Sequence, residues 1–493
     1  MKKLPSLVLL FIVTTVTFAQ KEANHWMFGE GLGLSFDTNN PRPVASNIQS
    51  ITACASISNP QSGELLFYSN GETVWNREHE VMQNGVGLRG ELSTNQGVLI
   101  TPFPGESDLY YLFTLSATVK EDSTSAQLYY SVVDMSLDNG LGAVLEQTKN
   151  TFITNRLTEK MTAIRHANGQ DFWLIVHEMW NNNFLVYHIG PGRVNLHRRV
   201  AIGSIHPIDT MDINMGSGYL KASPNGKKLA QTQYSGSMGV PLELFDFDST
   251  TGTISNPLSL GNFLTQHGMS FSPDNTKLYV NGTCTNCPGP PDIFYQFDLE
   301  QNDIAASRIG LIFNNPRFDF NPLDNSWAAI ALQNAPDGKI YTTGSSGNLR
   351  DPQLVTSDLL VINNPNAHGY DSDIRLVSFN FRSGMVRNGL PNFIESTFNN
   401  LSPTNNPNAP CSDEIGIDLY PNPTGDYITL EVAERCFSEY TLSFYNTIGQ
   451  FMGQHLVDRQ EFGPIEVKSF KSGLYFAVLE FADGRIVKRF IKL

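Results

Sequence analysis

The hydrophobic and polar positions of this chain repeat as a short unit: an apolar strand, a tight turn and a second apolar strand. Six copies occur, at residues 56–68, 99–113, 162–176, 220–230, 269–280 and 329–341. In the clearest copies Pro presets φ at the first corner, Asp or Asn tolerates the next position, and Gly or Asn takes the positive φ that closes the reversal. The residues around each turn alternate with period two, which predicts strands with one buried face.

The spacing of these units indicates the architecture. The residues that close the turns are Gly63, Gly105, Gly169, Gly226, Asn275 and Gly338, at intervals of 42, 64, 57, 49 and 63 residues. Periods of roughly 40–50 residues with four strands per unit are typical of β-propeller blades. The intervals here are longer, so we expect long connecting loops. Third strands are predicted at residues 184–187, 242–248, 293–298 and 359–362.

The two ends of the repetitive region carry strand patterns that could complete the ring of blades. Residues 389–394 have the pattern of an inner strand with no hairpin after it, whereas 26–28 and 32–36 have the pattern of strands with no inner strand before them. Together they would form one more blade, and closing the ring would remove free sheet edges. We therefore predict an all-β protein in which residues 20–398 form a β-propeller of seven blades closed by both termini, with six or eight blades as alternatives.

A smaller domain is predicted after the repeats. Residues 399–414 are rich in Asn and Pro and have no apolar periodicity, which is typical of an extended, solvated linker. From 415 to 493 the pattern restarts, with short alternating strands at 427–432, 440–445, 473–479 and 486–491. Strands at this spacing, separated by Gly turns, predict a β-sandwich.

The net charge and the N-terminal residues indicate which partners are disfavoured and where the protein is sent. The formal net charge of −15 disfavours nucleic acid, because such a partner requires a basic face. Residues 1–19 are predicted to be a signal peptide, since Lys2 and Lys3 precede the apolar run 7–13 and small residues predict cleavage between Ala19 and Gln20. That run is far shorter than the roughly 20 residues that span a bilayer, and no later stretch resembles a transmembrane segment.

The five cysteines suggest disulfides in an oxidising compartment. Cys284 and Cys287 lie between a strand end and a Pro-rich loop, without the helix of a redox site or the second pair of a zinc site. We expect a local disulfide there. Cys411 and Cys436 could pair across the start of the last domain, and Cys54 is predicted to be a buried thiol.

Four ordered blocks near the C-terminus follow a known pattern. They contain Pro421, Asn422, Pro423, Asn446, Gly449, Gln450, Gly473, Leu474, Tyr475, Lys488 and Lys492. These blocks resemble the type A C-terminal sorting domain of the type IX (Por) secretion system of Bacteroidetes. The resemblance implies recognition by the type IX secretion machinery, passage through the outer membrane after Sec export, removal of this domain, and a final location outside the cell or on its surface.

The repeats also resemble a group of secreted propeller-like proteins from the same bacteria. The matching blocks lie at 24–29, 63–76, 335–341, 361–366 and 389–393. This resemblance implies a fold and a location but no chemistry.

Linear motifs within the repeats favour structural roles. His177 and Glu178 lack the second His of a metalloprotease helix and lie in a strand pattern. Ser237 lacks the preceding Gly and the strand-to-helix turn of a nucleophile elbow. The stretch 246–252 departs from a calcium-binding EF-hand at its Gly and at its last ligand, which favours a strand-ending turn.

The sequence therefore predicts no catalytic residue and no cofactor, although a structural calcium site built from several loops stays open. The favoured function is non-catalytic binding of an extracellular protein or glycan. The alternative is a hydrolase or lyase acting on extracellular polysaccharide, because polar groups distant in sequence can converge on one propeller face. A deep central pocket with converging ionisable groups would favour the enzyme, whereas a filled or shallow centre would favour binding.

Overall fold

The computed structural model has two compact units, Met1–Thr404 and Asn405–Leu493, and their boundary falls within the predicted linker. It describes residues 21–38, 41–116, 125–206, 216–235, 238–285, 294–312, 328–345, 358–379, 381, 384–399, 401, 417–420, 422–432, 440–447, 449–457, 464–481 and 484–493. Strands dominate these residues, and the helices are short 3₁₀ turns: η1 (Asp138–Gly140), η4 (Gly369–Ser372) and η5 (Glu395–Phe398). In the part of the chain described, no helix is long and apolar enough to cross a membrane.

The first unit begins with a three-stranded antiparallel sheet of β1 (His25–Phe28), β2 (Glu30–Ser35) and β3 (Arg42–Gln49). A 12-stranded sheet follows, made of three runs of four strands. The first run is β4 (Ala55–Ser58), β5 (Leu65–Ser69), β6 (Thr73–Asn76) and β7 (Val81–Val86). The second is β8 (Val98–Pro102), β9 (Leu109–Leu115), β10 (Ala126–Asp134) and β11 (Ala143–Val144). The third is β12 (Thr151–Arg165), β13 (Phe172–Glu178), β14 (Asn181–Gly190) and β15 (Arg193–His206).

Three more sheets follow in the first unit. One contains β16 (Leu220–Ala222), β17 (Lys228–Gln231), β18 (Val240–Asp248), β19 (Thr253–Leu264) and β22 (Thr283–Cys284). The next contains β20 (Met269–Phe271), β21 (Lys277–Asn281), β23 (Phe294–Asp298) and β24 (Ile309–Gly310). The last contains β25 (Ala328–Asn334), β26 (Ile340–Ser345), β27 (Asp358–Ile362) and β28 (Ile374–Ser378). The predicted third strands are confirmed as β14, β18, β23 and β27.

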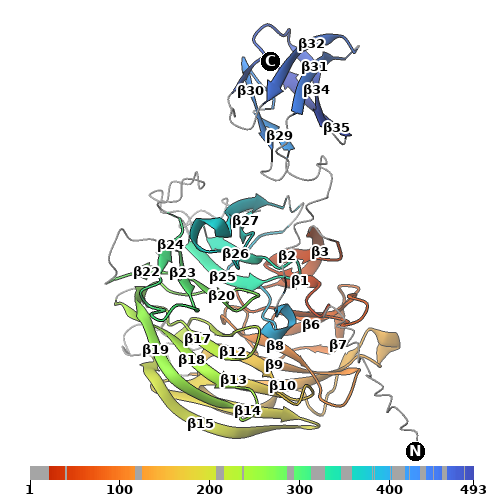
Figure 1. The fold of residues 1–493 in the computed structure, drawn as a ribbon. Coiled ribbons are helices and arrows are strands. Elements are labelled where there is room, and N and C mark those ends of the chain that lie inside the picture. Colours follow the sequence, from red (N-terminus) through yellow and green to blue (C-terminus); the bar gives the residue numbers. More distant parts are fainter. Residues whose placement is uncertain are drawn as a thin grey trace, which may run out of the picture. The chain divides into compact units, whose positions relative to one another are not determined.

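The first strands of successive runs and sheets, which we call the inner strands, lie next to one another. β1 contacts β4, β4 contacts β8, β8 contacts β12, and the series continues through β16, β20 and β25. The first and last sheets also meet, because Trp26 of β1 packs edge-on against Tyr341 of β26 with ring centroids 5.7 Å apart. Figure 1 shows the red β1–β3 sheet beside the teal strands β25–β27. The first unit is thus all-β, with a propeller-like arrangement of its sheets.

The six predicted turns are confirmed. Their closing residues, five glycines and Asn275, all have positive φ, between 68° and 88°. In the β16–β17 turn the Gly226 amide donates to Ser223 O at 2.8 Å, and Gly338 makes the equivalent bond to Ala335 O at 3.0 Å. A side chain with a Cβ costs roughly 1–2 kcal/mol in the left-handed region, which is why Gly or Asn occupies these positions.

The structure corrects the predicted composition of the seventh blade. Residues 389–394 form no strand. Instead, the amides of Asn388 and Asn392 donate to the carbonyls of Ile51 and Cys54, just before β4. Pro391 has no N–H for a ladder, so this apolar stretch cannot complete a sheet there. The β1–β3 sheet takes all three strands from the N-terminal side, including β3, which the sequence pattern did not predict.

The two ends of the first unit nevertheless meet. Glu30 of β2 and Met385 form an isolated antiparallel bridge, with each amide donating to the other's carbonyl at 2.9 and 3.0 Å. The rings of Trp26 and Phe393 lie 6.0 Å apart. A short segment near the C-terminal end, rather than a strand, therefore joins the beginning of the unit to its end.

The second unit consists of two sheets. One contains β29 (Ile417–Tyr420), β30 (Tyr427–Val432) and β33 (Ile465–Glu466). The other contains β31 (Tyr440–Asn446), β32 (Phe451–Val457), β34 (Gly473–Phe481) and β35 (Gly484–Lys492). Ile428 and Leu430 of the first sheet share one buried core with Leu442, Phe444 and Phe490 of the second. Two sheets closed on one core form a sandwich, as predicted.

Several predicted features lie outside the described residues. They are the signal peptide with Ala19 and Gln20, the cysteines Cys287, Cys411 and Cys436, and Pro421 and Ser237. Cys284 takes part in a disulfide, but its pairing with Cys287 stays a prediction. Cys54 is confirmed as a buried free thiol, and burial raises its pKa.

Candidate functional site

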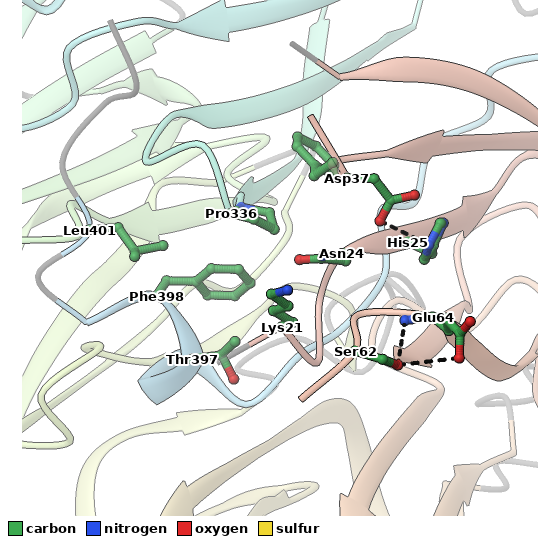
Figure 2. A pocket seen from close by; sticks show the side chains of 11 residues that line it. Lys21, Asn24, His25, Asp37, Ser62, Glu64, Pro336, Thr397, Phe398 and Leu401 are labelled. Atoms are coloured by element: carbon green, nitrogen blue, oxygen red, sulfur yellow. Dashed lines mark hydrogen bonds and ion pairs between the residues drawn. The ribbon is translucent and has the colours of Figure 1, made fainter. Parts of the chain in front are cut away.

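The first unit carries a cavity at the end where the six hairpin turns lie, which we call the turn face (Figure 2). Its volume is about 450 Å³. It is lined by Lys21, Asn24, His25, Phe36, Asp37, Ser62, Glu64, Pro336, Thr397, Phe398 and Leu401. These residues come from the start of β1, the end of β2, the β4–β5 and β25–β26 turns, and the chain around η5. The fold thus assembles the cavity from both ends of the unit.

An imidazole–carboxylate pair forms one wall of this cavity. His25 Nε2 lies 3.4 Å from Asp37 Oδ1, and the two side chains are 15% and 43% exposed. Burial lowers the pKa of His25, and the negative charge of Asp37 partly opposes that decrease. Figure 2 shows Lys21 and Asn24 between this pair and the apolar side chains of Phe398 and Leu401.

A second cavity adjoins the first and shares His25 and Glu64 with it. Its volume is about 640 Å³, and its walls include Arg77 and His79 together with apolar side chains such as Leu65. Burial lowers the pKa of His79, and the nearby His25 lowers it further. The two cavities, which together we call the turn-face cleft, present cationic, anionic and apolar groups.

The turn-face cleft combines charged side chains with apolar walls. Within the described residues, no hydroxyl or thiol side chain hydrogen-bonds to the His25 ring, so the His25–Asp37 pair lacks the activated nucleophile of a hydrolase. Mixed charges beside apolar walls instead suit the orientation of a polar ligand.

A segment near the C-terminal end of the first unit bonds to several of its inner strands. We call residues 388–398 the crossing segment. Asn392 Nδ2 donates to Val98 O of β8 at 3.3 Å and to Met161 O of β12 at 3.2 Å, while its amide bonds to the residue before β4. One buried residue therefore bonds to two inner strands through its side chain and to the residue before a third through its amide. The segment then reaches the turn face, where Thr397 and Phe398 line the cleft.

A buried ion pair fixes the crossing segment on the other side. Lys221 Nζ of β16 lies 2.5 Å from Glu395 Oε1, with the side chains 2% and 1% exposed. Gln333 Nε2 and Asn334 Nδ2 of β25 each donate to the Glu395 carboxylate at 3.2 Å. A buried carboxylate satisfied by one ammonium and two carboxamide groups is a structural anchor, and it leaves this carboxylate shielded from solvent.

A second group of buried ionisable side chains lies between the β12–β15 run and the β16–β19 sheet. Lys160 Nζ is 2.8 Å from His206 Nδ1, and both residues are fully buried. Burial lowers the pKa of Lys160 to about 7 and that of His206 well below its ordinary value. Ser204 Oγ lies 3.1 Å from His206 Nε2 but donates its proton to Glu243 Oε2 at 2.7 Å. Ser204 is therefore not set up as a nucleophile for His206, and none of these residues lines the turn-face cleft.

Two of the motifs considered in the repeats lie within the described residues. His177 is fully buried in β13, where its Nδ1 pairs with the Glu178 carbonyl at 2.7 Å. Asp248 ends β18 and accepts hydrogen bonds from the Thr250 amide and the Thr251 hydroxyl, which form the predicted turn. In the residues that the structure describes, no group of three or more His, Cys, Asp or Glu side chains is arranged to hold a metal ion.

The sorting-motif residues of the second unit hold strand ends and a hairpin. Asn422 Nδ2 donates to Arg489 O at 3.1 Å, and its Oδ1 accepts from the Ile491 amide at 2.9 Å, so the segment before β30 is bound to β35. The Asn422–Pro423 peptide is cis. The Gly449 amide donates to Asn446 O at 3.0 Å, which closes the β31–β32 turn.

Of the remaining motif residues, Gln450 lies in the β31–β32 turn and the others lie on β34 and β35. Gln450 N donates to Asn446 Oδ1 at 2.9 Å. Gly473 begins β34, and the next residue, Leu474, is 38% exposed. Tyr475 Oη donates to Lys471 O at 2.8 Å. Lys488 is half-buried on β35, and Lys492 Nζ lies 3.9 Å from Asp426.

The second unit can be assigned from these blocks and its sandwich. Residues 418–493 match the secretion system C-terminal sorting domain family. The protein is exported by the type IX secretion system to the cell surface or the extracellular space. This confirms the resemblance seen in the sorting motif, and it implies contact with the secretion machinery.

Comparisons of the whole chain are less specific. Its structure is similar to that of a protein from Lactobacillus plantarum, with 11% identity, 82% of this chain and 96% of the other covered, and a TM-score of 0.37. Hydrazine synthase of Kuenenia stuttgartiensis has 14% identity, coverage of 78% and 90%, and a TM-score of 0.36. A quinonprotein alcohol dehydrogenase-like protein from Bacteroides thetaiotaomicron has 8% identity, coverage of 76% of each chain, and a TM-score of 0.35. These values do not bear on activity. The comparison with curated proteins found no match.

Proposed function

We propose that the first unit is a seven-bladed propeller, closed by both ends of the chain, that binds an extracellular protein or glycan without chemical turnover. Seven inner strands, β1, β4, β8, β12, β16, β20 and β25, support this count, with the contact between the first and last sheets completing the ring. The missing strand of the β1–β3 blade is replaced by the crossing segment at the axis.

The observation that carries the proposal is the filled axis. Glu395, an ionisable group at the proposed axis, is paired with Lys221 and buried. The Asn392 side chain donates both of its hydrogen bonds to backbone carbonyls of inner strands. The turn-face cleft, by contrast, combines accessible charge with apolar walls. We therefore assign ligand binding to that cleft, with Asp37, Glu64 and Arg77 supplying the polar contacts.

A binding and turnover experiment tests this proposal. The exported protein is applied to a glycan array and to immobilised surface proteins, and the same sample is incubated with a panel of polysaccharides. We expect binding without any release of reducing or unsaturated ends. Degradation of any polysaccharide would overturn the non-catalytic assignment and favour a hydrolase or lyase.

A matched pair of variants tests the location. Glu64 and Glu106 are both exposed and each follows the turn glycine of its hairpin, but only Glu64 lines the cleft. Glu64→Gln should weaken binding roughly tenfold, because a charge-assisted hydrogen bond contributes more than about 1.4 kcal/mol. Glu106→Gln should bind as the unmodified protein does. Equal affinities for the two variants would exclude the cleft as the binding site.

A further inference from the structure

The four-stranded sheet of the second unit carries a group of apolar side chains on the side that faces away from the core. Its strand order is β32–β31–β34–β35, and Figure 1 shows these strands side by side. Phe444 of β31, Tyr475 of β34 and Phe490 of β35 point into the core shared with the other sheet. Because successive side chains of a strand point to opposite faces, their chain neighbours point outward. We call the following eight residues the outer face: Tyr445, Phe451, Leu474, Phe476, Val478, Val487, Arg489 and Ile491.

One row of the outer face crosses all four strands. Phe451 of β32 is paired with Tyr445 of β31, and their ring centroids are 5.8 Å apart. Tyr445 is also paired with Phe476 of β34, which in turn is paired with Arg489 of β35. Residues directly opposite each other in antiparallel strands have Cβ atoms roughly 4.5–5.5 Å apart. Three aromatic side chains and one guanidinium group therefore lie next to one another across the sheet.

Aliphatic pairs extend the outer face on both sides of this row. Leu474 of β34 is opposite Ile491 of β35, and Val478 is opposite Val487 on the same two strands. Four of the apolar side chains are between 38% and 53% exposed, namely Phe451, Leu474, Val487 and Ile491. Continuous exposed apolar surface of this kind marks interaction sites in soluble proteins. Aromatic and Arg side chains, which form the central row, are also enriched in the buried cores of protein interfaces.

The outer face is continuous with the sorting motif. Gly473, Leu474 and Tyr475 begin β34, and Lys488 and Lys492 lie on β35. The Tyr475 ring belongs to the core of the sandwich, whereas Leu474 is exposed on the outer face. An exposed apolar side chain adds little to the stability of its own domain, so its place in the motif fits contact with a partner. The family match implies that partner, since a sorting domain contacts the secretion machinery.

The charge of the strands that carry the outer face indicates the chemistry of the partner. Residues 468–493 contain six Lys or Arg and two Asp or Glu, whereas the whole chain contains 33 and 48. Arg489 is exposed within the outer face itself. Complementary charges at the edge of an interface speed association and fix the orientation of the partners. We propose that the outer face docks on a protein of the type IX secretion machinery that presents an apolar surface bordered by carboxylates. This inference rests on the sorting domain and is independent of the ligand bound by the first unit.

Cross-linking of the full chain in cells with an active type IX secretion system tests the location. A photo-reactive amino acid replaces Val487 in one variant and Tyr427 in the other, and cross-linked products are identified by mass spectrometry. Tyr427 is the matched control, because it is 52% exposed on β30 of the other sheet. We expect the probe at 487 to cross-link to a protein that the export of other sorting-domain proteins also requires, and the probe at 427 not to do so. Cross-links from 487 only to a second copy, to the first unit or to lipid, or none at all, would overturn the proposal.

Substitutions on the outer face test its role in export. The double variant Val487→Thr and Ile491→Thr removes apolar surface but keeps β-branched side chains, which strands favour. We expect roughly tenfold less extracellular protein, with the missing protein in the periplasm and an unchanged melting temperature, because a few central side chains carry most of the binding energy of an interface. Arg489→Glu should also reduce export, whereas Arg489→Lys and the control Tyr427→Thr should not. Normal export of both the double variant and Arg489→Glu, or an equal loss for Tyr427→Thr, would overturn the proposal.

Discussion

Replacing Glu395 by Gln removes the negative charge that faces the buried Lys221 ammonium group. The two side chains are 2.5 Å apart and almost fully buried, so solvent cannot compensate the remaining positive charge. Breaking a buried pair in this way costs roughly 3–5 kcal/mol. The Gln333 and Asn334 carboxamides also lose a charged acceptor, although the Gln carbonyl retains part of that hydrogen bonding. The free energy of unfolding should therefore fall by about 3–5 kcal/mol.

The assay is urea unfolding of the exported protein followed by tryptophan fluorescence, with Asp246→Asn as the control. Asp246 pairs with Lys228 at 2.7 Å, but these side chains are 40% and 34% exposed, so the control should lose at most about 1 kcal/mol. The double variant Lys221→Met and Glu395→Leu should recover most of the loss, because no uncompensated charge remains. A Glu395→Gln variant as stable as the control would refute the assignment of this pair as the anchor of the crossing segment.

Three further outcomes are expected. Gly338→Val should lose roughly 1–3 kcal/mol, since φ is +75° there, and an unchanged melting temperature would count against that turn. Deleting residues 415–493 should leave the protein in the periplasm, whereas an unchanged extracellular yield would exclude the sorting role. Burial lowers the pKa of Lys160 from 10.5 to about 7, so between pH 7 and pH 10.5 this side chain is protonated in the unfolded chain but not in the folded one. The free energy of unfolding should therefore rise with pH across that range. Lys160→Met should flatten this slope in denaturant titrations, and an identical slope would contradict the shift.

Features that depend on local chemistry could be predicted from the sequence. The turn residues Gly226, Asn275 and Gly338 adopt positive φ because of their own backbone preferences, and the strands on either side follow from period-two alternation. The sorting domain was recognisable because its blocks are contiguous and ordered. These predictions needed no knowledge of contacts between distant residues.

The crossing segment and the turn-face cleft depend on long-range contacts. The stretch around Asn392 has the apolar pattern of a strand, but its bonds go to carbonyls of two inner strands and of the segment before a third. Lys221 and Glu395 are 174 residues apart, and nothing local pairs them. One available signal was a charged residue within an apolar inner strand, as with Lys160 and Lys221, because such a residue must find a buried partner.

The most direct test of the account is a cross-link between the two ends of the first unit. Glu30 and Met385 form a hydrogen-bonded antiparallel pair, for which the Cα separation is about 5.5 Å and suits a disulfide. If the crossing segment closes the ring, the double variant Glu30→Cys and Met385→Cys should form this disulfide spontaneously, as detected by mass spectrometry of the unreduced digest. Two free thiols at these positions in folded, oxidised protein would show that the ends do not meet and would contradict the closed propeller.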